Sequence, residues 1–184
     1  MNDKIFIFLS RPNPFLKEHE IFLDKLKEYI KKYDMETITL QAANYDLTDS
    51  LRYLKGMIKQ CYGMIIVGFN QYYFEKGYKK RGGKKCEKYF CPEEKDVSKM
   101  SLSSPFCQIE GTIGITNDLP ILILNQENVI EEGILMGGRY SVKTRQFSLD
   151  KIDDFFSDPI VSKQISVWVG KVIDYHLFLT QKRY

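Results

Sequence analysis

Short apolar runs alternate along this chain with longer segments whose apolar residues recur at helical spacing. Residues Ile5–Leu9 form a continuous apolar run that ends in the loop Ser10–Pro14, which is typical of a buried parallel strand followed by a loop. The spacing of apolar residues over 16–33 then predicts an amphipathic helix. A second short strand is predicted over Thr37–Leu40. This opening is the beginning of a repeating strand–helix pattern.

The same alternation continues through most of the remaining chain. A polar loop over 44–49 offers Thr48 or Asp49 as the cap of a helix whose apolar face carries Leu51, Leu54, Ile58 and Cys61. Further strands are predicted over Met64–Phe69 and Leu119–Leu124, and further helices over 105–117 and 159–181. Asp158 and Pro159 stand at the favoured cap and first-turn positions of the last helix.

The resulting order is β-α-β-α-β-insertion-α-β-loop-α, which predicts an α/β fold with a parallel sheet and helices on both faces. We expect a single domain over residues 1–184. In such sheets the ligand crevice lies beyond the carboxyl ends of the strands. The loops 10–14, 44–49 and 69–73 should therefore meet there, beside the start of the helix that contains Glu110.

A long insertion, residues 71–103, interrupts the pattern before that helix. Between Lys76 and Lys88 the chain has seven basic residues against a single acidic one. A solvated loop is the expected structure, although the interleaved Tyr78 and Tyr89 leave contact with nucleic acid open. The net charge of the whole chain, +3, is too small to imply a nucleic-acid partner, and none is expected.

Composition narrows the class of protein. Hydrophobic residues make up 43% of the chain, enough for a core, so general disorder is not expected. No apolar run reaches the roughly 18–20 residues that a membrane helix requires, and the first residues lack the pattern of a signal peptide. We expect a cytoplasmic protein with no membrane partner, in which the four cysteines are reduced.

A metal site is not expected either. Cys86 and Cys91 have the spacing of half a zinc site, but the two histidines, His19 and His176, both lie on predicted helices. Four ligands are needed for a structural zinc site, so the pair alone does not make one.

The string Ser104-Pro105-Phe106-Cys107-Gln108-Ile109-Glu110 contains the most informative candidate chemistry. Ser104 can cap the helix, which places Glu110 in its first turns at the mouth of the sheet. Gly111 and Gly114 leave the neighbouring backbone bare, so that a ligand can approach closely. A half-buried carboxylate in such a place is the kind of group whose pKa proteins tune for chemistry. The alternative is a first-turn residue favoured only by the helix dipole.

Three segments together resemble the Toll/interleukin-1 receptor (TIR) domain family. Phe8-Leu9-Ser10 resembles its first box, Ser50–Tyr73 is similar to the segment from the loop after the second strand through the third strand, and Ser104-x-Phe106-Cys107-x-x-Glu110 resembles its Ser-x-Trp-Cys-x-x-Glu box. The matches cover roughly residues 4–125. The chain departs from the family in Phe106, in the length of its insertion and over 126–158.

The resemblance implies a flavodoxin-like, TIR-like sheet and cleavage of NAD at the nicotinamide–ribose bond, with Glu110 as the catalytic residue. NAD would be the substrate, with no separate cofactor. The product would be an ADP-ribose-derived signal, linear or cyclic, for an effector protein in bacterial antiphage defence. The resemblance also allows a homo-oligomer, but the sequence does not give the oligomeric state.

Substrate-binding roles follow for seven further residues. Arg11, beside Ser10, can pair with a diphosphate; Tyr45 can stack on a base and Asp46 can bind sugar hydroxyls. Phe69 can stack on a ring, and Cys107, beside Phe106, has a thiol that a helix N-terminus would make more reactive. The plain alternatives are a solvated charge for Arg11, packing for Tyr45 and Phe69, and a small buried apolar residue for Cys107.

Two other functions remain open from the sequence. The chain also resembles nucleoside deoxyribosyltransferase-like proteins, which use a glutamate at a similar place and would prefer a smaller substrate. A non-catalytic TIR-like adaptor, which works through surface contacts, fits Phe106 and the insertion equally well.

Overall fold

The structure is a computed structural model that describes residues 4–40, 50–86, 88–89, 91–139 and 141–182. Its centre is a five-stranded sheet in the order β2-β1-β3-β8-β9, in which every neighbouring pair is parallel. The strands are β1 (Ile5–Ser10), β2 (Met35–Ile38), β3 (Gly63–Gly68), β8 (Ile121–Asn125) and β9 (Ser141–Lys143). This order is that of flavodoxin-like sheets, so the predicted fold class is confirmed.

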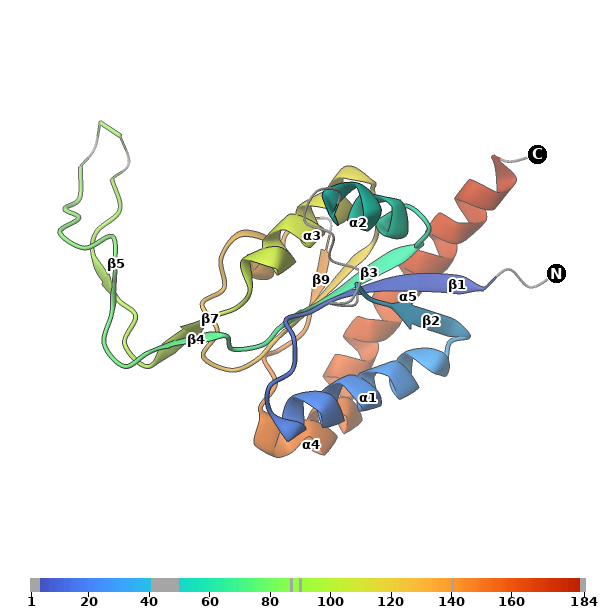
Figure 1. The fold of residues 1–184 in the computed structure, drawn as a ribbon, viewed down its shortest axis with the longest axis horizontal. Helices are drawn as coiled ribbons and strands as arrows, with labels where there is room; N and C mark the ends of the chain where they lie inside the picture. Colours follow the sequence, from blue (N-terminus) through green and yellow to red (C-terminus); the bar gives the residue numbers. More distant parts are fainter. Residues whose placement is uncertain (1–3, 41–49, 87, 90, 140, 183–184) are drawn as a thin grey trace.

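Helices cover both faces of the sheet (Figure 1). One face is covered by α1 (Lys17–Lys31), α4 (Ile152–Ser157) and α5 (Pro159–Gln181), and the other by α2 (Ser50–Ile58) and α3 (Pro105–Thr116). Two short 3₁₀ helices, η2 (Gly133–Met136) and η3 (Leu149–Lys151), lie in the connections after β8 and β9.

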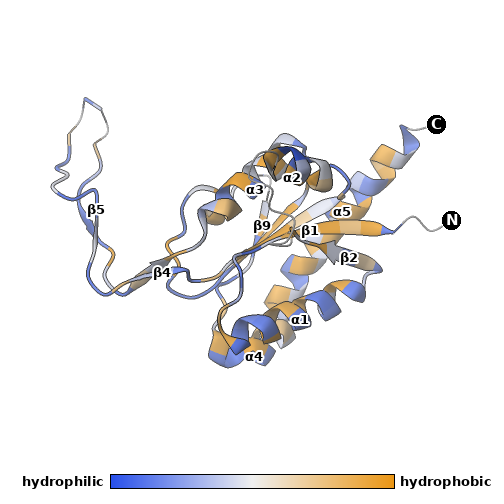
Figure 2. Cartoon of the chain, viewed as in Figure 1, coloured by the Kyte–Doolittle hydropathy of each residue, from blue (hydrophilic) through white to orange (hydrophobic). Residues whose placement is uncertain are grey.

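Alternate side chains of β3 point to opposite faces of the sheet, so this one strand contributes to the hydrophobic core on each face. Ile65 and Val67 belong to the core under α1 and α5, whereas Met64 and Ile66 belong to the core under α2 and α3. All six residues of β3 are buried, which is why its sequence is a continuous apolar run rather than an alternating one. Figure 2 shows hydrophobic residues along β1 and along the sheet-facing sides of the helices.

Several element boundaries differ from the prediction. The chain turns at Asp34 with a positive φ of 56° and enters β2 at once, so that buried Met35 pairs with Ile5, two residues before the predicted start. Both β9 and α4 lie in the predicted loop after β8. A three-residue strand of sequence Ser-Val-Lys has no periodic pattern to reveal it.

The insertion forms a projecting arm, defined here as residues 71–103 (Figure 1). Two antiparallel strand pairs build it: β4 (Tyr72–Phe74) with β7 (Met100–Leu102), and β5 (Tyr78–Lys79) with β6 (Lys95–Asp96). Near its tip Cys86 and Cys91 are joined by a disulfide. The predicted reduced state is therefore wrong for this pair, because the β-bridge between them brings their Cα atoms to 5.0 Å.

The other two cysteines, Cys61 and Cys107, are free and buried. Within the described part of the chain, no helix has the length and apolar character needed to cross a membrane.

Candidate active site

The candidate site lies where the strand order of the sheet reverses, at the carboxyl ends of β1 and β3. Ser10 is the last residue of β1, and Arg11 follows it. The chain leaves β1 for β2 on one side, whereas β3 and β8 lie on the other. Ligands of open α/β sheets bind at this switch point. Ser10 and Arg11 both influence the ionisation of Glu110 on α3, so the structure brings these three predicted residues together.

Helix α3 begins where the sequence predicts. The Ser104 hydroxyl accepts a hydrogen bond of 3.2 Å from the backbone N–H of Phe106, and Pro105 stands in the first turn. The helix therefore starts just outside the sheet edge and passes back across β3, with Glu110 in its second turn.

The glycines after Glu110 serve packing rather than ligand approach, which corrects the prediction. A Cβ on Gly111 would lie 2.5 Å from Ile134 and 2.8 Å from Ile66, and one on Gly114 would lie 2.7 Å from the Met64 sulfur. Both glycines thus let α3 sit closely on the sheet. This close packing is what buries the carboxylate one residue earlier.

Glu110 is buried, with 6% of its surface exposed. Burial raises the pKa of Glu110 to about 7, while the Ser10 hydroxyl and the Arg11 guanidinium act in the opposite direction. Ser10 Oγ forms no well-aligned hydrogen bond among the described residues, so its influence comes from proximity. At neutral pH the carboxyl group is consequently divided between its neutral and ionised forms.

Arg11 is half-buried beside this carboxylate. One terminal nitrogen, Nη1, donates a 3.1 Å hydrogen bond to the Pro12 carbonyl, and the buried Nε has no partner among the described residues. Burial lowers the pKa of Arg11, and the Glu110 carboxylate opposes that shift. A buried N–H without a partner is unfavourable, and an anionic ligand that reached the guanidinium would satisfy it.

Cys107 does not have the reactivity predicted for it. The thiol is fully buried and points toward the Val67 carbonyl at 3.9 Å. Burial raises the pKa of Cys107 to about 12, and the nearby Glu110 carboxylate adds to the rise. The expected effect of the helix N-terminus is therefore overridden by desolvation.

The position of Phe69 does not allow the ligand stacking predicted for it. It is fully buried and stacks on His19 with ring centroids 4.2 Å apart, with Phe22 and Phe147 at its edges. No face of the ring is left for a ligand, so Phe69 is a core residue. Phe106, in contrast, is half exposed in the first turn of α3.

Two predicted residues, Tyr45 and Asp46, lie outside the described residues, as do Thr48 and Asp49. Leu51 in the next helix is 61% exposed and thus does not belong to the buried face predicted for it.

A second polar cluster lies at the end of β8, around Asn125, a residue that the sequence pattern did not single out. Asn125 is buried and its side-chain N–H₂ donates to Glu131 at 3.0 Å and to the Leu135 carbonyl at 2.9 Å. Burial alone would raise the pKa of Glu131, but hydrogen bonds from Lys143, Asn125 and Gln146 lower it overall. The sequence does contain a sign of this cluster, because the polar residue Asn125 ends the buried strand β8 just as Ser10 ends β1.

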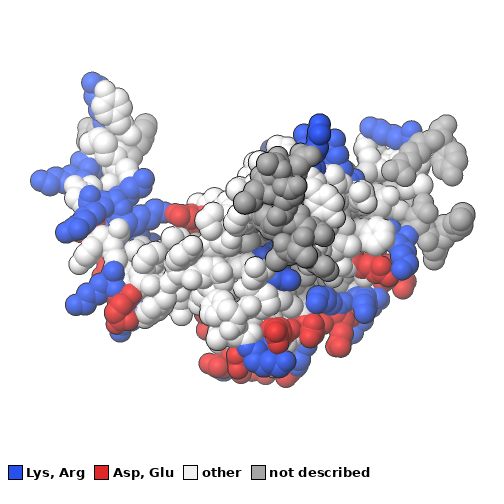
Figure 3. Space-filling model, in the orientation of Figure 1, with Lys and Arg blue, Asp and Glu red and all other residues white. Residues whose placement is uncertain are grey.

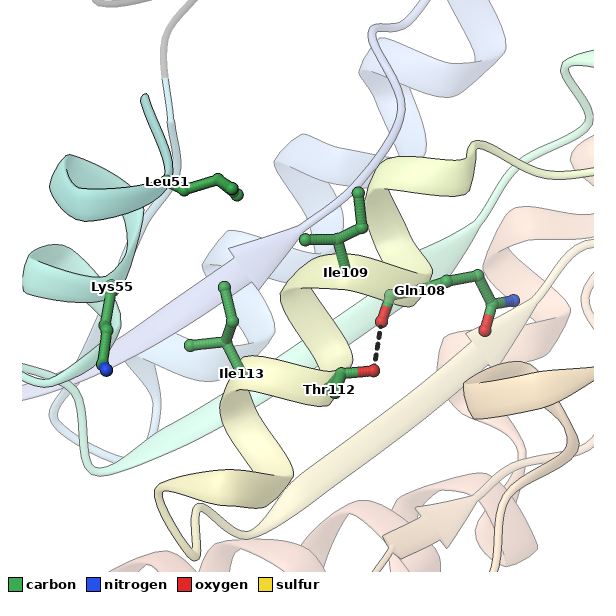
Figure 4. Close-up of a pocket in the computed structure, with 6 residues that line it drawn as sticks. All are labelled: Leu51, Lys55, Gln108, Ile109, Thr112 and Ile113. Carbon is green, nitrogen blue, oxygen red and sulfur yellow. Dashed lines mark hydrogen bonds between the residues drawn. The ribbon is translucent and has the colours of Figure 1, made fainter. Parts of the chain in front are cut away.

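An apolar groove lies on the outer side of α3 (Figure 4). Its volume is about 450 Å³, and it is lined by Leu51, Lys55, Gln108, Ile109, Thr112 and Ile113. The lining residues come from α2 and α3, and Glu110 is not among them. The groove is therefore distinct from the candidate site.

The described residues contain no cluster of three or more histidine, cysteine, aspartate or glutamate side chains that could hold a metal ion. Cys86 and Cys91 form a disulfide, so neither sulfur is available as a thiolate ligand in this structure.

No protein-family model matches the chain, and no curated protein matches it in sequence. Among solved structures, the chain is similar to the Clostridium botulinum CMP N-glycosidase BcmB. The two share 13% sequence identity with a TM-score of 0.48, over 82% of this chain and 93% of that one. The resemblance to TIR domains thus stays a prediction, and function is inferred below from the residues of the site.

Proposed function

We propose that this protein is an N-glycosidase that cleaves the nicotinamide–ribose bond of NAD or the corresponding bond of a related nucleotide, with Glu110 as its catalytic carboxylate. The observation that supports this most is the burial of Glu110 beside Arg11 at the switch point of the sheet, which raises the pKa of the carboxyl group to about 7. The folded chain tolerates an unfavourable carboxylate there, a common mark of a functional group.

The chemistry of the bond matches a single buried carboxylate. Cleavage of an N-glycosidic bond develops positive charge on the ribose in an oxocarbenium-like state. A carboxylate fixed close to that carbon stabilises the charge or captures it as a nucleophile. Because the site is shielded from water, this attraction is stronger than it would be in solution. Nicotinamide leaves NAD as a neutral molecule, so no general acid is needed.

Arg11 supplies a complementary binding group in this proposal. Its guanidinium lies close enough to interact electrostatically with Glu110 and has an unpaired buried N–H. A nucleotide phosphate held by Arg11 would place the adjacent ribose near Glu110. The same contact would neutralise the phosphate while leaving the carboxylate available to the ribose.

A smaller nucleoside or nucleotide is the second candidate substrate. With a pKa near 7, Glu110 is partly protonated at neutral pH and can donate a proton to a departing base that needs one. The two candidate reactions require different protonation states of Glu110. NAD cleavage needs the carboxylate and should increase with pH, whereas acid-assisted cleavage should decrease.

The test is a substrate panel followed by mass spectrometry. NAD, a pyrimidine nucleoside monophosphate and a deoxynucleoside are each incubated with the protein, with and without a crowding agent that promotes assembly. Released base and sugar products are quantified, which also separates hydrolysis from cyclisation. The matched variants are Glu110→Gln and Glu127→Gln, the second being an exposed carboxylate after β8.

Base release by the wild type and by Glu127→Gln, but not by Glu110→Gln, supports the proposal. Equal release by all three proteins contradicts the role of Glu110. No release from any substrate in either condition favours the non-catalytic adaptor. Whether a product then acts as a signal for an effector protein in antiphage defence belongs to the same proposal and depends on which product is found.

A further inference from the structure

The arm concentrates positive charge away from the α/β body. Residues 71–103 contain nine basic and five acidic residues, a surplus of four, whereas the whole chain has a net charge of only +3. The remainder of the protein is therefore slightly negative. Figure 3 shows the basic side chains gathered over the arm, while acidic and basic side chains mix on the body.

These cations face solvent, and few of them are neutralised. All nine basic residues of 76–99 are exposed. Lys79 pairs with Glu132 on the body at 2.6 Å. Within the described part of the chain, Lys80, Arg81, Lys84 and Lys85 form no ion pair with a carboxylate. Like charges held this close repel one another, and a polyanion that binds to them relieves that repulsion.

Exposed aromatic rings are spaced along the same arm. Tyr72, Tyr73, Tyr78 and Tyr89 are 57–73% exposed, and Lys88 lies over the Tyr89 ring at 5.1 Å. Four exposed rings on one short projection are unusual for a merely solvated loop, in which polar residues are expected. Rings interleaved with cations match a chain in which planar bases alternate with phosphates.

Hydrogen bonds and a disulfide connect the described residues of the arm and hold these groups in place. The Gly83 N–H donates to the Lys80 carbonyl at 2.7 Å and the Gly82 N–H donates to Glu94 at 2.7 Å. The Cys86–Cys91 disulfide closes the tip. At the base, Ser101 exchanges backbone hydrogen bonds of 2.8 and 2.7 Å with Asn128 and Ile130. Because the surface is pre-organised, less ordering entropy is lost when a ligand binds.

The arm also begins and ends at the candidate active site. The chain leaves β3 after Gly68, two residues before the arm begins, and the return strand β7 ends at Leu102, two residues before Ser104, the cap of α3. A strand bound along the arm would therefore be anchored beside the mouth of the site.

We infer that the arm is a binding surface for single-stranded nucleic acid, in which its lysines and Arg81 contact phosphates and its exposed tyrosines stack on unpaired bases. The inference is independent of the proposed N-glycosidase activity. A duplex would satisfy the cations but would hide its bases from the rings, so single strands should bind more tightly.

Binding is measured by fluorescence anisotropy with end-labelled 20-mers of oligo(dT) and oligo(U) over a series of salt concentrations. A charge variant carries Gln at Lys80, Arg81, Lys84 and Lys85. Its matched control carries Gln at four exposed lysines on α1 and α5, namely Lys17, Lys31, Lys163 and Lys171. A ring variant, Tyr78→Ala with Tyr89→Ala, is compared with the corresponding double Tyr→Phe variant. Circular dichroism verifies that each variant is folded.

We expect the charge variant to bind at least ten-fold more weakly at about 50 mM salt, with a logarithmic salt slope smaller by roughly 3, whereas its control binds like the wild type. The double Tyr→Ala variant should lose about ten-fold or more, and the Tyr→Phe variant should not.

Three results would overturn the inference: no binding of either oligonucleotide at 50 mM salt, equal loss in the charge variant and its control, or unchanged affinity in the Tyr→Ala variant. Binding to anionic vesicles of phosphatidylserine without binding to oligonucleotides would likewise assign the arm to a membrane surface instead.

Discussion

Replacing Glu110 with glutamine should stabilise the protein, and the gain should grow with pH. The folded protein holds the Glu110 carboxyl group with a pKa raised from 4.5 to about 7. In the unfolded chain the group is solvated and has its ordinary value. Between these two values the folded state binds more protons than the unfolded state, so stability falls as pH rises from about 4.5 to 7. Glutamine is neutral at every pH and removes this loss.

The size of the effect follows from the shift. A difference of roughly 2.5 pKa units corresponds to about 3 kcal/mol of unfavourable free energy once both states are ionised, at about 1.4 kcal/mol for each unit. At pH 5 less than about 1 kcal/mol of that cost has developed, and at pH 8 nearly all of it has. The stability gained by Glu110→Gln should consequently be larger at pH 8 than at pH 5 by about 2–3 kcal/mol.

The assay is urea unfolding followed by circular dichroism at pH 5 and pH 8, for the wild type, Glu110→Gln and a control, Glu28→Gln. Glu28 is exposed on α1, and its variant should show the same difference from the wild type at both pH values. Any change of shape caused by the glutamine acts equally at both pH values, so it cancels in the comparison. A gain that is equal at pH 5 and pH 8, or smaller at pH 8, would refute the burial argument for Glu110.

Three further predictions concern catalysis and packing. If NAD is the substrate, kcat/KM should rise with pH to a plateau above about pH 7, where Glu110 is ionised; a profile that falls over this range contradicts NAD cleavage by a carboxylate. Arg11→Gln should raise the KM for NAD about ten-fold and leave that for nicotinamide riboside, which lacks the diphosphate, nearly unchanged; equal effects on both would exclude a phosphate contact. Gly111→Ala should lower the free energy of unfolding by about 1–3 kcal/mol, because the new methyl group meets Ile134 and Ile66, and an unchanged denaturation midpoint would show that α3 can shift.

The sequence pattern predicts the frame of this fold because burial leaves a strong signal. The runs Ile5–Leu9 and Met64–Phe69 are continuous and apolar, and helices cover both faces of the strands they form. The caps at Ser104 and Asp158 fix where α3 and α5 begin, since each side chain accepts backbone hydrogen bonds there. The frame then dictates where the first strand ends, and thus where Ser10 and Arg11 lie.

The remaining features depend on tertiary contacts that one sequence does not encode locally. From the sequence alone, Gly111 predicts open backbone beside Glu110, whereas in the fold Ile134 lies against it. The same is true of Phe69, whose ring lies against His19 and Phe147. It is also true of Cys107, whose thiol faces the Val67 carbonyl on β3. Both side chains are buried. The two strand pairs of the arm could not be predicted from hydrophobic periodicity, because their strands are two or three residues long and largely exposed.

Release of free base from NAD by the wild type and by Glu110→Gln tests the central claim most directly. The proposal predicts that the wild type releases nicotinamide, that Glu127→Gln releases it at a similar rate, and that Glu110→Gln is slower by at least about a hundred-fold. A Glu110→Gln protein that is correctly folded and releases nicotinamide as fast as the wild type would contradict the assignment of Glu110 as the catalytic carboxylate.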